Sequence, residues 1–163
     1  MKRIVTCFFA VFLLLFIFGC RCNVGTEQIE RIERCLSIDL EDLTDAWIKE
    51  IYSHTDAAGR TLTIQYIDLE GAEEFVTRQL EASECWCALP YDQAVAALLT
   101  ASGASGHYAF ESVEDGLFII SGVSGGDGNV DFDRKNFDDW TTYQIGIWDA
   151  SAGTLYFVSV AAQ

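Results

Sequence analysis

The sequence predicts an α+β fold, a small single domain with a largely antiparallel sheet of about five strands and two main helices. Segments in which apolar and polar residues alternate are typical of strands, and apolar residues three and four positions apart are typical of helices. The predicted order is strand, strand, helix, helix, strand, strand, strand. It lacks the regular strand–helix alternation of a parallel sheet, which favours the α+β class.

The first two strands are predicted at residues 45–53 and 61–67. The second alternates cleanly between apolar and polar residues. The first also fits a helical spacing, but the turn-rich stretch from His54 to Gly59 that follows it favours a strand. The two segments therefore form a predicted hairpin.

Two helices are predicted next, at residues 70–82 and from Tyr91 to the Gly/Ser-rich stretch 102–106. In the first, Phe75 belongs to the apolar side, and acidic residues occupy the first turn, where the helix dipole favours them. In the second, apolar residues recur at i, i+4, i+7 and i+8 from Tyr91. A brief helix is also indicated at residues 27–36.

Three strands complete the domain, at residues 117–121, 142–148 and 154–160. The last two are joined by residues 149–153, which are rich in the small and polar side chains of turns. They therefore form a second predicted hairpin.

The N-terminus predicts export. Met1–Arg3 is positively charged, and Ile4–Phe18 is an almost unbroken apolar run. That run is shorter than the roughly 20 residues that span a bilayer, and it ends at Cys20 rather than at a basic cluster. We predict a cleaved signal peptide over residues 1–19. An uncleaved anchor and an ordinary secretory signal are the alternatives, and each of them also places the folded part outside the cytoplasm.

The four residues Ile17-Phe18-Gly19-Cys20 resemble the lipobox of bacterial lipoproteins, in which a small residue precedes a cysteine that receives lipid. The resemblance implies that Cys20 becomes the N-terminus and carries acyl chains, which bury CH₂ groups at about 0.8 kcal/mol each. The chain would then be held to the bacterial cell membrane by this anchor, with residues 20–28 as a short tether and 29–163 as a single α+β domain.

The charge balance excludes one class of partner. The chain has 10 basic and 25 acidic residues, a formal net charge of −15, and cleavage of the signal would also remove Lys2 and Arg3. So acidic a surface repels phosphate backbones and anionic headgroups, which excludes nucleic acid as a partner. The composition indicates solubility at a cell surface. It does not specify a protein or small-molecule partner.

The cysteines limit which disulfide bonds and metal sites the domain could form. An extracytoplasmic location permits disulfides, and a bond from Cys35 to Cys85 or Cys87 would tie the N-terminal segment to the middle of the domain. A bond between Cys85 and Cys87 would close a very tight ring, and zinc-site spacing is absent. The sequence does not choose among the pairings. The cysteines available after the signal and the lipidated residue are Cys22, Cys35, Cys85 and Cys87.

An acidic stretch at residues 127–138 predicts an alternative function, binding of calcium or another cation. Oxygen-bearing side chains occupy positions 1, 3, 5, 7 and 12, as they do in EF-hand loops. Position 6 is Phe132 rather than glycine, and no helices are predicted on either side, so a solvated acidic loop is the competing interpretation. The candidate metal ligands are Asp127, Asn129, Asp131, Asp133 and Asp138.

No catalytic residue is predicted. Gly122–Gly126 matches the G-x-S-x-G pattern, but a Gly/Asp loop follows where the nucleophile elbow needs a helix, and both histidines precede it. His54 and His107 are interpreted as isolated surface residues near turns. Among the tryptophans, Trp140 beside Asp138 and Asp139 is expected to be the most exposed.

A wider resemblance rests on Trp86 followed by Leu89-Pro90, on the strand 116–120, and on the closing hairpin 143–157. In these features the chain resembles a group of uncharacterised small secreted or lipid-anchored domains of Gram-positive, often gut-dwelling, bacteria, over most of residues 36–162. The group has no assigned activity, so the resemblance implies no site residues. The turn at His54–Arg60 is shorter and poorer in Gly and His than in that group. The sequence thus predicts a lipid-anchored extracytoplasmic domain, a non-enzymatic binding or envelope protein.

Overall fold

The computed structural model of the chain describes residues 24–40, 47–69, 71–124, 129–134 and 140–161. The chain divides into two units, residues 1–30 and 31–163. The buried hydrophobic residues of the described chain run from Ile32 to Val158, so the second unit contains its own core. We therefore expect this unit to fold without the residues that precede it. None of the described helices combines the length and apolar character that crossing a bilayer requires.

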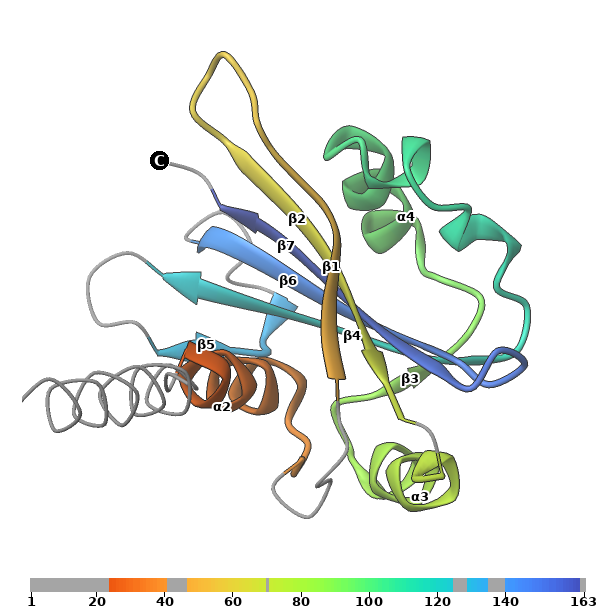
Figure 1. Cartoon of the computed structure of the whole chain (residues 1–163). Helices are drawn as coiled ribbons and strands as arrows, with labels where there is room; N and C mark the ends of the chain where they lie inside the picture. The colour runs from red at the N-terminus through yellow and green to blue at the C-terminus, as the bar shows by residue number, and fades with distance from the viewer. Residues whose placement is uncertain (1–23, 41–46, 70, 125–128, 135–139, 162–163) are drawn as a thin grey trace, which may run out of the picture. The chain divides into compact units, whose positions relative to one another are not determined.

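A seven-stranded sheet forms the body of residues 31–163 (Figure 1). Its strands run in the order β1-β2-β7-β6-β4-β3, β5 pairs with β4 off this path, and every pairing is antiparallel. The strands are β1 (Trp47–Thr55), β2 (Thr61–Asp68), β3 (Cys87–Ala88), β4 (Gly116–Ser124), β5 (Val130–Asp131), β6 (Trp140–Asp149) and β7 (Thr154–Ala161).

The helices confirm the α+β class, while the element count differs from the expectation. The described chain has the two main helices expected and a third α-helix of 13 residues that includes the brief one indicated at residues 27–36, and β3 and β5 add strands to the five expected. These extra strands have two residues each, too few for alternation to reveal them. The helices are α2 (Val24–Leu36), which begins within the expected tether, α3 (Glu73–Ala82), α4 (Gln93–Ala101), and the 3₁₀ helices η1 (Ala104–Gly106) and η2 (Phe110–Ser112).

Successive side chains of a strand point to opposite sides of the sheet. Both faces of this sheet contain buried side chains. On one face, Ile145 belongs to a core cluster with Val95 and Leu99 of α4. On the other face, a Cβ at Gly146 would meet Leu36 at the end of α2. Helix α4 and the last turns of α2 therefore cover opposite faces of the same strands (Figure 1).

The end of α2 is held by polar groups that satisfy its last carbonyls, which have no partner within the helix. The Oγ of Ser121, a fully buried residue of β4, donates to the carbonyl of Cys35 at 2.8 Å. The indole Nε1 of the buried Trp86 donates to the carbonyl of Leu36, also at 2.8 Å. These two bonds fix the position at which α2 ends on the sheet.

Two expectations about aromatic exposure are wrong. Trp140 is buried at 5% exposure and packs in the α4-side core, not in solvent. A Cβ built at Gly122 would lie 1.7 Å from the Trp140 ring, so this glycine leaves the recess that the indole fills. Phe75, expected on the apolar side of its helix, is 36% exposed, because α3 buries only Val76 and Leu80.

Candidate functional site

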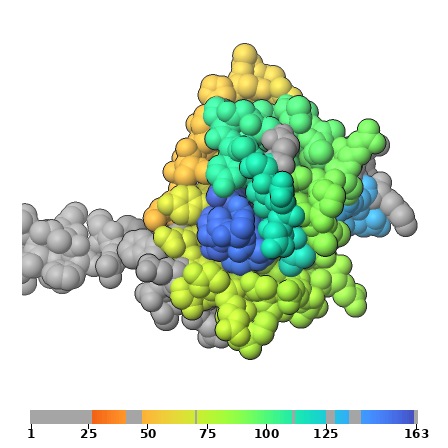
Figure 2. Space-filling model, turned by 90° about the vertical axis from the view of Figure 1, so that its right-hand side faces the viewer, coloured from red at the N-terminus to blue at the C-terminus, as the bar shows by residue number. Residues whose placement is uncertain are grey.

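Two adjoining cavities lie between the β1–β2 hairpin and the end of α4, on the sheet face that α4 covers. Figure 2 shows the tip of the hairpin, in orange and yellow, next to the segment around and after α4, in green and teal. Four residues line both cavities, so the cavities share a wall. These residues are Arg60, Ala101, Ser102 and Val160.

The first cavity has a mixed lining and a volume of about 220 Å³, and we call it the polar cavity because more polar side chains line it than line the second cavity. His54 reaches it from β1, and His107 reaches it from the segment that follows η1. The His107 ring stacks on Tyr52, with the ring centroids 3.5 Å apart and an angle of 23° between the planes. Both histidines are exposed, as the sequence predicted, but they are not isolated, because both line one cavity, which Asp56 also lines.

Asp56 holds the hairpin turn that carries Arg60. Its carboxylate accepts hydrogen bonds from the backbone N–H groups of Ala58 and Arg60, at 2.8 and 3.0 Å. It also accepts from the Arg60 Nε at 2.8 Å. The hydrogen bond from the Arg60 backbone is the largest cause that holds the pKa of Asp56 below its usual value. Asp56 is thus an anion that positions Arg60, which does not suit the role of a proton acceptor.

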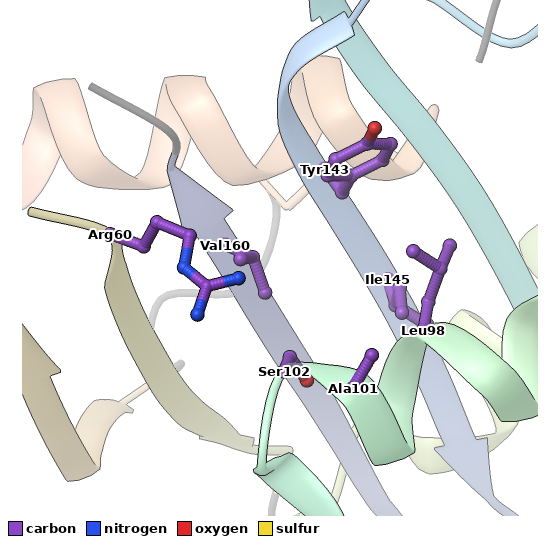
Figure 3. A pocket seen from close by; sticks show the side chains of 7 residues that line it. All are labelled: Arg60, Leu98, Ala101, Ser102, Tyr143, Ile145 and Val160. Carbon is purple, nitrogen blue, oxygen red and sulfur yellow. The ribbon is translucent and has the colours of Figure 1, made fainter. Parts of the chain in front are cut away.

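The second cavity is an apolar slot of about 130 Å³ (Figure 3). Figure 3 shows the Arg60 side chain extended over Val160, while Leu98 and Ala101 project from the α4 side. An apolar cavity of about 150 Å³ is known to accept benzene, so this slot has the size of one six-membered ring. Its lining residues are Arg60, Leu98, Ala101, Ser102, Tyr143, Ile145 and Val160.

The arrangement suits binding better than covalent chemistry. The Ser102 hydroxyl donates to the Leu99 carbonyl at 3.0 Å and accepts from the Ala104 N–H at 3.3 Å, so it caps the end of α4. Asp56, as shown above, is committed to Arg60. What remains is a small apolar slot next to a cavity that two imidazoles line, and such a pair of cavities can bury apolar surface of a ligand and hydrogen-bond to it.

The predicted cation site is only partly described. Asp127 and Asp138 lie outside the described residues, while Asp131 is part of β5. Its carboxylate accepts from the Asp133 backbone N–H at 2.8 Å and from the Trp140 indole at 3.4 Å. Within the described ranges, no three or more His, Cys, Asp or Glu side chains are grouped so as to hold a metal ion. Calcium binding with Asn129 and the four aspartates stays a prediction.

The remaining sequence candidates are placed as follows. Gly122–Ser124, the first three residues of the G-x-S-x-G pattern, form the end of strand β4. The last two glycines of that pattern lie outside the described residues, and so does Cys20. Cys35, Cys85 and Cys87 are separate free thiols, buried, half-buried and exposed respectively, so no bond joins Cys35 to the other two in this structure. Burial raises the pKa of the Cys35 thiol.

Comparison with known proteins gives no relative: no family model, no curated protein and no solved structure matches the chain. The site is therefore interpreted from its own chemistry.

Proposed function

We propose that this chain is an exported, lipid-anchored domain that binds, without catalysis, a ligand with an aromatic ring in the slot between α4 and strands β6 and β7. The slot beside the polar cavity is the observation that carries the binding proposal. The lipobox-like residues before Cys20 support the anchor. The proposed ligand reaches the domain outside the cytoplasm, at the membrane surface.

The walls of the slot set the chemistry of the ligand. Ile145 is 2% exposed and Val160 and Leu98 are partly buried against the same core, so the inner surface is aliphatic. Arg60 lies where the slot adjoins the polar cavity, which His54 and His107 line. A ring with one hydrogen-bonding substituent matches both parts.

The charge of the ligand follows from the protein's own charge. A formal net charge of −15 repels anions over the whole surface, and the Arg60 charge is compensated by Asp56 at 2.8 Å. We therefore propose a neutral aromatic ligand rather than an aromatic acid. Burial of one ring contributes about 3 kcal/mol and one hydrogen bond about 1 kcal/mol, and association costs translational and rotational freedom, so the dissociation constant of a ligand of minimal size is no lower than about 1 mM.

Substitution of Ala101 by leucine is expected to weaken binding of 4-methylphenol by at least about tenfold, which is a loss of about 1.4 kcal/mol. The added side chain fills the slot that the methyl group of Ala101 lines. Isothermal titration calorimetry on residues 24–163 measures this change.

The matched control is Ala97→Leu, one turn earlier on α4. Ala97 is exposed and is not among the residues that line the slot, so this variant should bind as the wild type does. Equal weakening in both variants, or no saturable heat in the wild type, contradicts the proposal.

A further inference from the structure

The outer edge of β4 is paired toward both of its ends and has a gap between them. β3 pairs with β4 at Leu117 and Phe118, and β5 pairs with it at Gly122 and Val123 (Figure 1). Among the described residues, no strand pairs on this side with residues 119–121. The edge of the sheet therefore contains a gap three residues long, which is about 10 Å at the rise of a strand.

The backbone of Ile120 faces this gap. The Leu89 N–H donates to the Gly116 carbonyl at 3.2 Å, so the backbone of Gly116 is directed toward β3. Backbone groups of every second residue in an antiparallel strand point the same way. The register of β4 with β6 is continuous from Gly116 to Val123, so no bulge interrupts this alternation before Ile120. The N–H and carbonyl of Ile120 are therefore directed to the same edge as those of Gly116.

The chain on either side of the gap turns away from Ile120. Continuation of the two registers would place Cys85 and Asp133 opposite this residue. The backbone N–H of Cys85 donates instead to the Ser83 hydroxyl at 3.3 Å. The backbone N–H of Asp133 donates to the Asp131 carboxylate at 2.8 Å. Neither of these two N–H groups donates to the Ile120 carbonyl.

A hollow of about 530 Å³ lies at the gap. Cys87 from β3 and Phe132, which follows β5, line it together with Ile120. The Ile120 side chain belongs to the α4-side core, so the backbone of this residue is the part directed to the hollow. The other lining residues are Glu84, Cys85, Asp133 and Arg134.

The charge of the hollow favours a cationic occupant. Glu84 and Asp133 are exposed acidic residues of its lining, whereas the Arg134 guanidinium is paired with the carboxylate of Asp92. The formal net charge of the whole chain is −15. A basic partner is therefore attracted to this surface, and a second copy of the chain is repelled from it.

We propose that the gap binds an extended, basic segment of a partner protein, which adds to the sheet edge beside β4. One residue of the segment donates its N–H to the Ile120 carbonyl and accepts from the Ile120 N–H, as a strand does when it joins an exposed edge. Basic side chains on either side of that residue pair with Glu84 and Asp133. This site is separate from the slot beside α4, and its occupation does not depend on the aromatic ligand.

The test is a titration of ¹⁵N-labelled residues 24–163 with the tripeptide acetyl-Lys-Leu-Lys-amide. We expect saturable shifts of the Ile120 and Cys87 amides. The acidic tripeptide acetyl-Glu-Leu-Glu-amide should bind at least about tenfold more weakly, because it is repelled by the acidic lining. The basic tripeptide with an N-methylated leucine should bind about fivefold more weakly, since it has lost the N–H that donates to the Ile120 carbonyl. These comparisons use the unaltered protein, so they do not depend on the folding of a variant.

The acidic lining is tested with Glu84→Gln, which should weaken binding of the basic tripeptide by about threefold. Glu81→Gln is the matched control, because Glu81 is an exposed glutamate on α3 that does not line the hollow. It removes the same charge and should leave the affinity unchanged. Equal weakening in both variants, equal affinity of the N-methylated and parent tripeptides, or the absence of saturable shifts at Ile120 would overturn the proposal.

Discussion

Replacement of Gly146 by valine is expected to lower the free energy of unfolding of residues 24–163 by about 3 kcal/mol. A Cβ at this position would lie 2.5 Å from Leu36 Cδ2 and 2.8 Å from both Ile119 Cγ2 and Trp86 Cη2. These neighbours are buried, and Leu36 and Trp86 are joined by a hydrogen bond that fixes the end of α2. The valine therefore forces the last turn of α2, at Leu36, away from the sheet.

Urea unfolding followed by tryptophan fluorescence measures this loss. Gly106→Ala is the control, because a Cβ at Gly106 meets nothing within 4 Å, and it should leave the midpoint unchanged. A stability of Gly146→Val within about 0.5 kcal/mol of the wild type, the range of ordinary surface substitutions, would show that α2 is not seated on the sheet as described.

Substitution of Cys20 by serine is expected to abolish retention of the full chain in the membrane fraction. The proposed anchor consists of the acyl chains on this residue, and serine offers no thiol to receive them. Cells that express the chain and are fed an alkyne-tagged palmitate analogue provide the measurement. The wild type should be labelled and sediment with membranes, and Cys20→Ser should do neither.

Cys22→Ser controls for the loss of a cysteine two residues further along, and it should be labelled like the wild type. Label in Cys20→Ser would assign the lipid to another residue. A wild-type chain that is unlabelled and found in the soluble interior of the cell would contradict both the anchor and export.

The regular parts of the fold were predictable because their signals are local. Alternation in residues 61–67 corresponds to β2, and helical spacing after Tyr91 corresponds to α4. The strand predicted at residues 154–160, after the turn-rich stretch 149–153, corresponds to β7. β3 and β5 were not predictable, since each exists only through pairing with β4, as in Cys87 with Phe118. No pattern within two residues carries that information.

The slot escaped sequence analysis for a related reason. Its walls come from the hairpin turn, α4, β6 and β7, and Ala101 resembles any solvent-facing alanine of a helix. The histidines were visible, but their proximity depends on the stacking of His107 on Tyr52, 55 positions apart in the chain. Trp140 was misjudged because its acidic neighbours suggested exposure, whereas the recess above Gly122 decides its burial.

The location of the ligand is the central claim, and backbone amide shifts in ¹H–¹⁵N spectra of residues 24–163 during a 4-methylphenol titration test it most directly. We predict saturable shifts centred on Ala101, Ser102 and Val160, with Arg60 at their border, because these residues line both cavities. Shifts centred instead on residues outside the two cavities, or no shifts at millimolar 4-methylphenol, would contradict it.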